Sequence, residues 1–444
     1  MRTIRIGSGA GYSGDRIDPA VELAEKGTLS YLAFECLAER TIALAQKARL
    51  SDPSAGFDPL LEERMEAVLP LCARNRIRVV SNMGAANPVA AMIKTRDVAR
   101  RLGLNGLRIA AITGDDVLSL VREEGFPLHE TGRPAASLGD RLLSANAYLG
   151  AEPIVAALQA NADIVLTGRV SDPSLFLAPL LYEFGWSTTD WNLMGQGTVI
   201  GHLLECAGQI TGGYFADPGF KEVPNLAHLG FPLAEVSEDG SAVITKVDGS
   251  GGMITRATCT EQMLYEIQNP AAYLTPDVVA DFSHVTLEDA GTGCVKVMGG
   301  RGHRRPDTLK VSVGFHDGYL GEGQISYAGP GARPRAELAR AILKERLTAH
   351  PLDELRFDLI GIDSIHGDRL SQPACDPWEV RLRAAGRSSS RRLAAMVLRE
   401  VEALYTNGPF GGGGVSGSTQ DTVGILTAFV PRDKVHPKVH MEVS

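Results

Sequence analysis

The chain has 444 residues and a formal net charge of −9 at pH 7. Hydrophobic residues make up 44% and charged residues 22% of it, which excludes a disordered chain. At about 100–200 residues per domain, this length predicts two or three domains. The acidic balance repels phosphate polymers and anionic membrane surfaces, so we expect neither nucleic acid nor a membrane as a partner.

The cysteines and the N-terminus indicate a cytoplasmic protein. The six cysteines form no C-x-x-C pair, so reduced thiols are expected. The N-terminus, MRTIRIGSGAGYSGD, reaches a strand and a glycine turn before any signal-peptide apolar region. The most apolar stretch, Leu175 to Tyr182, is much shorter than the ~18 residues that span a bilayer. Histidine and carboxylate groups lack the spacing of a known metal site, so no metal is expected.

Short, nearly continuous hydrophobic runs recur in the first half of the chain. They predict strands at Thr3–Ile6, Tyr31–Phe34, Arg78–Ser81, Arg108–Ile112 and Ile164–Thr167. Helical patterns lie between them, at Leu37–Arg49, Pro59–Arg74, Pro88–Leu102 and Pro153–Ala160. Strands that are apolar on both faces are typical of a parallel sheet covered by helices. We therefore expect an α/β fold in which residues 1–214 form a doubly wound, mostly parallel sheet domain.

The pattern changes after Tyr214. Glu-Asp-Gly between two apolar runs in PLAEVSEDGSAVITK predicts a hairpin. Further elements are expected as strands at Cys294–Met298, Leu309–Phe315, Phe357–Ile362 and Gly424–Val430, and as helices near Arg335–Leu347 and Ser389–Leu404. The irregular alternation predicts a C-terminal α+β domain over residues 215–444.

The opening glycines have the spacing of a dinucleotide-binding turn. Gly9-x-Gly11-x-x-Gly14 follows a strand and precedes a helix, and Glu35 ends the next strand about twenty residues later. Asp15 directly follows the third glycine, however, where its carboxylate opposes a pyrophosphate. We therefore expect no tight NAD binding, and a tight turn capped by Asp15 is the alternative explanation.

Arginine and aspartate pairs follow two of the predicted strands, at the sheet edge where ligands bind in this architecture. Asp15 and Arg16 follow the first strand, and Arg169 and Asp172 follow the fifth. An arginine holds a carboxylate with two parallel hydrogen bonds, so Arg16 and Arg169 are candidate substrate-binding residues. Asp15 and Asp172 are candidate acids or bases, and local ion pairs are the alternative explanation.

Two asparagines follow the third strand, in SNMGAANP. Asn82 and Asn87 offer amide N–H donors that can stabilise an oxyanion, so both are candidate substrate-binding residues. Asn87 precedes Pro88, and a helix cap explains it equally well.

Two later motifs add candidates. Glu205, in GHLLECAGQITGG, is a third candidate catalytic residue if it is buried beside the site, whereas Cys206 is expected to be structural. Gly411, Gly412 and Gly413, in GPFGGGGVSGS, expose backbone N–H groups that can bind a phosphate or a thioester oxygen. A mobile loop is the alternative explanation for these glycines.

The segments GYSGDRID, SNMGAANP, VLTGRVSDPSLFLAPL, HLLECAGQITGGYF and EQMLYEIQNPAAYLTPDVVADF resemble the acyclic terpene utilisation AtuA family over nearly the whole chain. Met83 and Ala85 depart from the Asn-Ala-Gly-Gly of many relatives. The resemblance implies cytoplasmic catabolism, since members are encoded near enzymes that degrade branched acyl-CoA thioesters or polycarboxylic acids. It also implies a small companion protein, which some relatives carry at the C-terminus and which is expected here as a separate subunit.

These residues and this resemblance together predict a lyase or hydratase. Its expected substrate is a carboxylated small molecule, either an acyl-CoA thioester or a small polycarboxylate, with CoA entering only as part of that substrate. Two alternatives remain, a non-catalytic subunit or scaffold of a catabolic multi-enzyme complex and a NAD-dependent oxidoreductase. We also expect a homo-oligomer.

Overall fold

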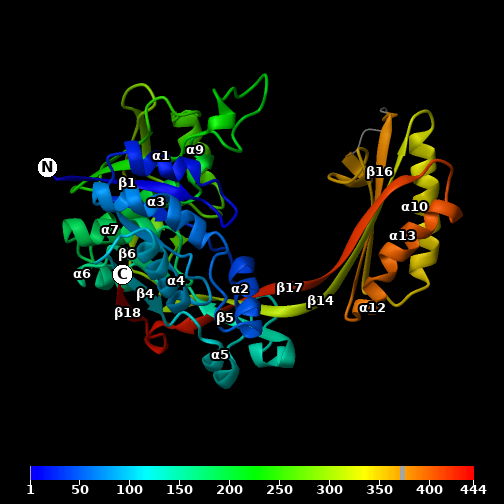
Figure 1. The fold of residues 1–444 in the computed structure, drawn as a ribbon, viewed down its shortest axis with the longest axis horizontal. Coiled ribbons are helices and arrows are strands. Elements are labelled where there is room, and N and C mark those ends of the chain that lie inside the picture. Colours follow the sequence, from blue (N-terminus) through cyan, green and yellow to red (C-terminus); the bar gives the residue numbers. More distant parts are fainter. Residues whose placement is uncertain (1, 371–375) are drawn as a thin grey trace. The chain divides into compact units, whose positions relative to one another are not determined.

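The computed structural model describes residues 2–370 and 376–444, which form two compact units (Figure 1). The first unit comprises Met1–Gly314 and Ile425–Ser444, and the second comprises Phe315–Gly424. This division differs from the boundary expected near residue 215. The reason is that the hairpin of β7 (Pro232–Ser237) and β8 (Ala242–Lys246) pairs with β1 (Thr3–Ala10) and so extends the first sheet.

A ten-stranded mixed sheet forms the centre of the first unit. Its order is β11 (Thr286–Asp289), β12 (Val295–Met298), β8, β7, β1, β2 (Tyr31–Phe34), β3 (Arg78–Ser81), β6 (Ile164–Thr167), β4 (Arg108–Thr113) and β18 (Lys438–Val443). The strands from β1 to β4 in this order are parallel, and the strands on both sides of them are antiparallel. The expected α/β class is therefore confirmed.

Helices cover both faces of the parallel strands. On one face, α1 (Asp18–Lys26), α3 (Leu61–Asn75) and α4 (Pro88–Arg101) bury apolar side chains against Leu32 and Phe34. Three further helices contact the same strands without joining that core cluster, so they lie on the other face: α6 (Glu152–Gln159), α7 (Ser174–Phe184) and α8 (Trp191–Glu205). Burial on both sides explains why these strands are apolar throughout.

The register of the parallel strands brings their carboxyl ends to one edge. Ala10 pairs with Phe34. Phe34 pairs with Ser81, and Ser81 with Leu166, the residue before the end of β6. The loops that begin at Gly11, Glu35, Asn82 and Gly168 therefore start side by side at this edge.

The remaining elements of the first unit lie around this sheet. They are α2 (Glu39–Ser51), α5 (Leu118–Glu124), β5 (Leu142–Ala147), α9 (Arg256–Leu264) and a small sheet of β9 (Tyr273–Leu274), β10 (Val279–Asp281) and β13 (Arg301–His303). Gly424–Val430, the last strand expected along the chain, lies within β17 (Gly413–Pro431), but a further strand, β18, follows it and pairs with β4.

The second unit is an antiparallel sheet with helices packed on it. The sheet order is β15 (Glu354–Ile360), β16 (Glu379–Ser388), β14 (Thr308–Ala328) and β17 (Gly413–Pro431). The start of β14, up to Gly314, and the end of β17, from Ile425, belong to the first unit. Its helices are α10 (Ala332–Thr348), α11 (Gly367–Leu370), α12 (Arg391–Ala394) and α13 (Met396–Asn407). Apolar residues of α10 and α13 pack on Ile325 and Leu382 of the sheet.

Two general features apply to the described part of the chain. Five cysteines are free thiols, and Cys375 lies outside the described residues. Within residues 2–370 and 376–444, no helix has both the length and the apolar character needed to span a bilayer.

Candidate active site

A cavity of about 440 Å³ lies at the carboxyl ends of the parallel strands. Gly11, Glu35 and Arg169 line it from the ends of β1, β2 and β6. Its other lining residues are Leu37, Ala38, Glu39, Tyr148, Ser171, Asp172, Glu205, Cys206, Tyr265, Glu266, Tyr273, Leu274, Thr275, Pro276, Pro306, Thr308, Leu309, Lys310 and Phe429. All of these residues belong to the first unit. The cavity therefore lies at the edge of the sheet that the sequence predicts for a site.

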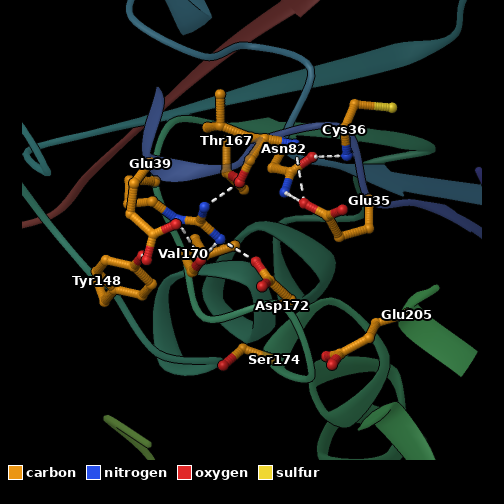
Figure 2. A network of polar contacts seen from close by, with 12 residues as sticks. Glu35, Cys36, Glu39, Asn82, Tyr148, Thr167, Val170, Asp172, Ser174 and Glu205 are labelled. Atoms are coloured by element: carbon orange, nitrogen blue, oxygen red, sulfur yellow. Dashed lines mark hydrogen bonds and ion pairs between the residues drawn. The ribbon is translucent and has the colours of Figure 1, made fainter. Parts of the chain in front are cut away.

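Glu35 is a buried carboxyl group at the end of β2. Its Oε1 accepts hydrogen bonds from Asn82 Nδ2 at 2.9 Å and from the backbone N of Leu37 at 2.8 Å (Figure 2). Burial, helped by the negative charge of Asp172, raises the pKa of Glu35 from 4.5 to about 8. Since both N–H donors reach Oε1, the proton is best placed on Oε2. The raised pKa of Glu35 therefore favours its protonated form at pH 7.

Asp172 follows β6 and lies beside Arg169. Its Oδ1 accepts a hydrogen bond from Arg169 Nη2. The Asp172 side chain keeps 37% of its surface exposed, so a molecule in the cavity can reach it. Desolvation by the surrounding protein raises the pKa of this carboxyl group, and the Arg169 guanidinium opposes that rise.

Arg169 is a buried arginine whose guanidinium is occupied by the protein itself. Its Nη1 donates to Leu37 O, and its Nε and Nη2 both donate to Val170 O. The guanidinium carbon also lies 4.5 Å from the ring centroid of Tyr148. Arg169 therefore orients Asp172 and the loop after β2, and it does not present the free carboxylate-binding fork that the sequence predicts.

A second buried aspartate fixes the backbone at Arg169. Asp115 Oδ2 accepts from Arg169 N at 2.9 Å and from Asn146 Nδ2 at 2.9 Å. A Cβ at position 168 would lie 2.5 Å from Asp115 Oδ1. Gly168 is therefore required for this approach.

Glu39, Tyr148 and Lys310 form a polar group on another part of the cavity. The Tyr148 hydroxyl donates to Glu39 Oε1 at 2.6 Å, and Lys310 Nζ donates to the same oxygen at 3.0 Å. These contacts outweigh burial and lower the pKa of Glu39 to about 2. Lys310 has a side chain that is 44% exposed, so its ammonium can still bind an anion.

Glu205 ends α8 and reaches the same cavity. Its Oε1 lies 2.8 Å from His202 Nδ1, one turn earlier on the helix. Burial raises the pKa of Glu205 to about 7, although His202 lowers it. A Cβ at position 201 would lie 2.6 Å from Pro173 O, so Gly201 lets α8 pack directly on the loop that carries Asp172. The carboxyl groups of Glu35, Asp172 and Glu205 thus face one region (Figure 2).

The remaining residues of the sequence-predicted site lie elsewhere. Asp15 is not among the lining residues, and its Oδ2 accepts from Gly11 N at 2.9 Å. It does not cap a helix, because α1 begins at Asp18 and has no side-chain cap. Arg16 is exposed and pairs with Asp18 and Leu229 O instead of facing the cavity.

The two asparagines have different surroundings. Asn82 does not line the cavity, but its Nδ2 holds Glu35 and its Oδ1 accepts from Cys36 N at 2.7 Å. Asn87 caps α4, since its Oδ1 accepts from Ala90 N at 3.3 Å. Its Nδ2 donates to Pro53 O and Ala55 O, so its amide is fully used within the fold.

The glycine-rich loop belongs to the other unit. Gly411, Gly412 and Gly413 lie in Phe315–Gly424, whereas the cavity is lined by the first unit. Gly413 is the first residue of β17, so the run is partly strand. The structure therefore assigns these three glycines to a different unit from the other candidates.

Several lining residues were not predicted from the sequence. Glu35 was noted only for its distance from the glycine turn, and Glu39, Tyr148 and Lys310 carried no motif. Tyr148 and Lys310 are 162 positions apart in the numbering, and only the fold makes them neighbours of one carboxylate. The one local signal for Glu35 was its position directly after a buried strand.

The fold and cavity define a mixed α/β protein whose parallel sheet carries buried carboxyl groups at its carboxyl edge. The family model described as "Acyclic terpene utilisation family protein AtuA" matches residues 4–441. The chain therefore belongs to the AtuA family. Searches among curated proteins and among solved structures gave no match.

Proposed function

We propose that this protein is a lyase or hydratase that acts on a small carboxylated substrate by proton transfer. One observation carries the proposal: three carboxyl groups with raised pKa values, Glu35, Asp172 and Glu205, line a single cavity. Removing water from a hydroxy acid needs a base that takes a proton from carbon and an acid that protonates the leaving hydroxyl. Carboxyl groups held near neutrality by burial supply both.

The roles follow from the protonation states. The raised pKa of Glu35 favours its protonated form at pH 7, so Glu35 is suited to protonate the leaving hydroxyl. Glu205, with a pKa near neutrality, is suited to take the proton from carbon. Asp172 is held by Arg169 and faces the same space, where its carboxylate can hydrogen-bond a substrate hydroxyl.

Lys310 supports the carboxylate part of the proposal. Its side chain is half-exposed at the cavity. One of the three N–H donors of its ammonium group is bound to Glu39 Oε1. The remaining N–H donors are suited to a substrate carboxylate. Lys310 therefore replaces Arg16 and Arg169 as the proposed binding residue for that carboxylate. Leu274, Leu309 and Phe429 supply apolar surface for the rest of the substrate, and about 440 Å³ suits a small molecule or the acyl part of a thioester.

The geometry of the glycine turn disfavours the oxidoreductase alternative. The backbone N–H of Gly11, which a phosphate would need, donates to Asp15. A Cβ at position 9 would lie 2.6 Å from the Phe34 ring, and one at position 11 would lie 2.5 Å from Cys206 C. Packing therefore explains these glycines without a dinucleotide.

The setting of the protein is also proposed. Reduced cysteines and the catabolic context implied by the family support a cytoplasmic enzyme. A homo-oligomer, with a small companion protein as a separate subunit, stays part of this proposal. Size-exclusion chromatography with light scattering measures the oligomeric state, and co-purification tests for the companion protein.

The test is a substrate panel. The purified protein is incubated, with and without its companion protein, with hydroxyacyl-CoA thioesters and hydroxy acids, and mass spectrometry follows the gain or loss of water and carbon–carbon cleavage. We expect turnover of a carboxylated member, with a higher KM in Lys310→Met. Absence of turnover under both conditions would favour the non-catalytic subunit.

A further inference from the structure

His202 and Glu205 form a buried pair beside the cavity. His202 is fully buried and Glu205 is 6% exposed, and the imidazole Nδ1 lies 2.8 Å from Glu205 Oε1. Only Glu205 of the two lines the cavity. His202 therefore lies behind the cavity wall and contacts the carboxyl group of Glu205.

The imidazole is held in place by aromatic side chains. Its ring centroid lies 5.7 Å from that of Tyr273 and 5.5 Å from that of Phe282. Gln262 Nε2 donates to His202 O at 3.0 Å, which ties α9 to α8 at this point. The position of Nδ1 against Glu205 is thus set by packing on both sides.

The second oxygen of Glu205 is free. Among the described residues, Glu205 Oε2 has no hydrogen-bond partner, and it is buried. A buried polar atom without a partner is unfavourable, and the side chain of Glu205 lines the cavity, so the unpaired Oε2 points to a group that arrives with the ligand. Oε1 is fixed by His202, and Oε2 is left to meet that group.

We propose that His202 is a positioning residue that holds Oε1 of Glu205 and so orients the carboxyl group for proton abstraction through Oε2. This inference rests on the proposed function in that it gives Glu205 the role of base. The link between His202 and the titration of Glu205 is measurable without turnover.

Several other ionisable groups act on Glu205. Asp172 and Glu266 raise its pKa through their negative charges, and Tyr273 and Cys206 are its other ionisable neighbours. His202 is the group that opposes them, through both charge and hydrogen bond. Burial works against the imidazolium, but the carboxylate of Glu205 outweighs it and raises the pKa of His202. Loss of the imidazole should therefore raise the pKa of Glu205.

Infrared difference spectroscopy tests this inference directly. The protonated carboxyl band of Glu205 is identified as the band lost in Glu205→Gln, and its titration is followed in the wild type, His202→Phe and His202→Asn. His202→Phe removes charge and donor, so we expect at least a tenfold rise in the proton affinity of Glu205. His202→Asn keeps an N–H near the Nδ1 position, so we expect a rise of the same sign but smaller size.

The controls distinguish an effect of His202 on Glu205 from a general effect on the fold. They also distinguish failure of this inference from failure of the proposed function. His228→Asn and His228→Phe change an exposed histidine outside the cavity and should leave the titration unchanged. If His202→Phe does not fold, His202→Asn decides. An unchanged titration of Glu205 in the folded His202 variants would overturn the inference, even with normal turnover. A shifted titration upholds it even if no substrate is turned over, which would count only against the proposed function.

Discussion

Asn82 donates from Nδ2 to Glu35 Oε1 at 2.9 Å and accepts from Cys36 N at 2.7 Å, so one amide fixes the carboxyl group and the backbone after β2. Asn82→Ala removes a contact that lowers the pKa of Glu35 and leaves a buried N–H unpaired. We expect a loss of about 1–3 kcal/mol in the free energy of unfolding, measured in urea, and a higher pKa for Glu35.

Asn87→Ala is the matched control for that change. It removes the cap of α4 and should cost about 0.5–2 kcal/mol without moving the titration of Glu35. Equal effects of the two variants on Glu35 would argue against a specific role for Asn82.

Arg16 and Arg169, the two arginines that the sequence predicts to bind substrate, should contribute very differently to stability. In Arg169→Lys the lysine cannot remake all the bonds to Leu37, Val170 and Asp172, and each charged hydrogen bond lost should cost about 1.5–3 kcal/mol. Arg16→Lys changes an exposed pair with Asp18 and should stay within ~1 kcal/mol of the wild type. Thermal melting compares them, and an Arg169→Lys protein as stable as the wild type would contradict the bonding described for Arg169.

The raised pKa of Glu35 predicts a pH-dependent stability. The folded protein keeps a proton on Glu35 up to about pH 8, whereas the unfolded chain releases it near 4.5. The stability due to this proton is therefore complete below pH 4.5 and is lost as the pH rises through 8. Glu35→Gln cannot ionise, so its stability relative to the wild type should increase as the pH is raised from about 5 to about 9.

Glu62, a partly exposed glutamate, should show the opposite pH dependence and serves as the control. Lys94 and Arg101 lower the pKa of Glu62, so its contribution is present at neutral pH and disappears in acid. Urea unfolding at several pH values measures the free energy of unfolding of Glu35→Gln and Glu62→Gln relative to the wild type. A stability difference for Glu35→Gln that does not change with pH would show that Glu35 ionises normally.

Much of the first unit could be predicted from the sequence because its strands are buried on both faces. The expected strands Tyr31–Phe34, Arg78–Ser81 and Ile164–Thr167 coincide with β2, β3 and β6. Nearly continuous apolar runs of this kind are typical of a parallel sheet that helices cover on both faces. The hairpin after Phe231 was also recognised, but the sheet to which it would pair was not, since pairing with β1 depends on residues more than 200 positions away.

The candidate site was predicted only in part. Asp172 and Glu205 were expected as catalytic residues and line the cavity together with Arg169. Asp15 and Arg16 follow a strand at the same edge, but a turn directs Asp15 back onto Gly11. Local spacing identifies the edge of a sheet, and it does not determine which side chains the packed loops leave facing the cavity.

Turnover in three carboxamide variants tests the central claim most directly. On the substrate found in the panel, kcat/KM is measured for Glu35→Gln, Asp172→Asn and Glu205→Gln, with Asn87→Ala as the control and melting temperature as the check on folding. We predict that Glu35→Gln and Glu205→Gln each lose at least about 100-fold while they stay folded, as loss of a general acid or base requires, and that Asn87→Ala keeps its activity. Wild-type turnover in folded Glu35→Gln and Glu205→Gln would contradict acid–base catalysis by these carboxyl groups.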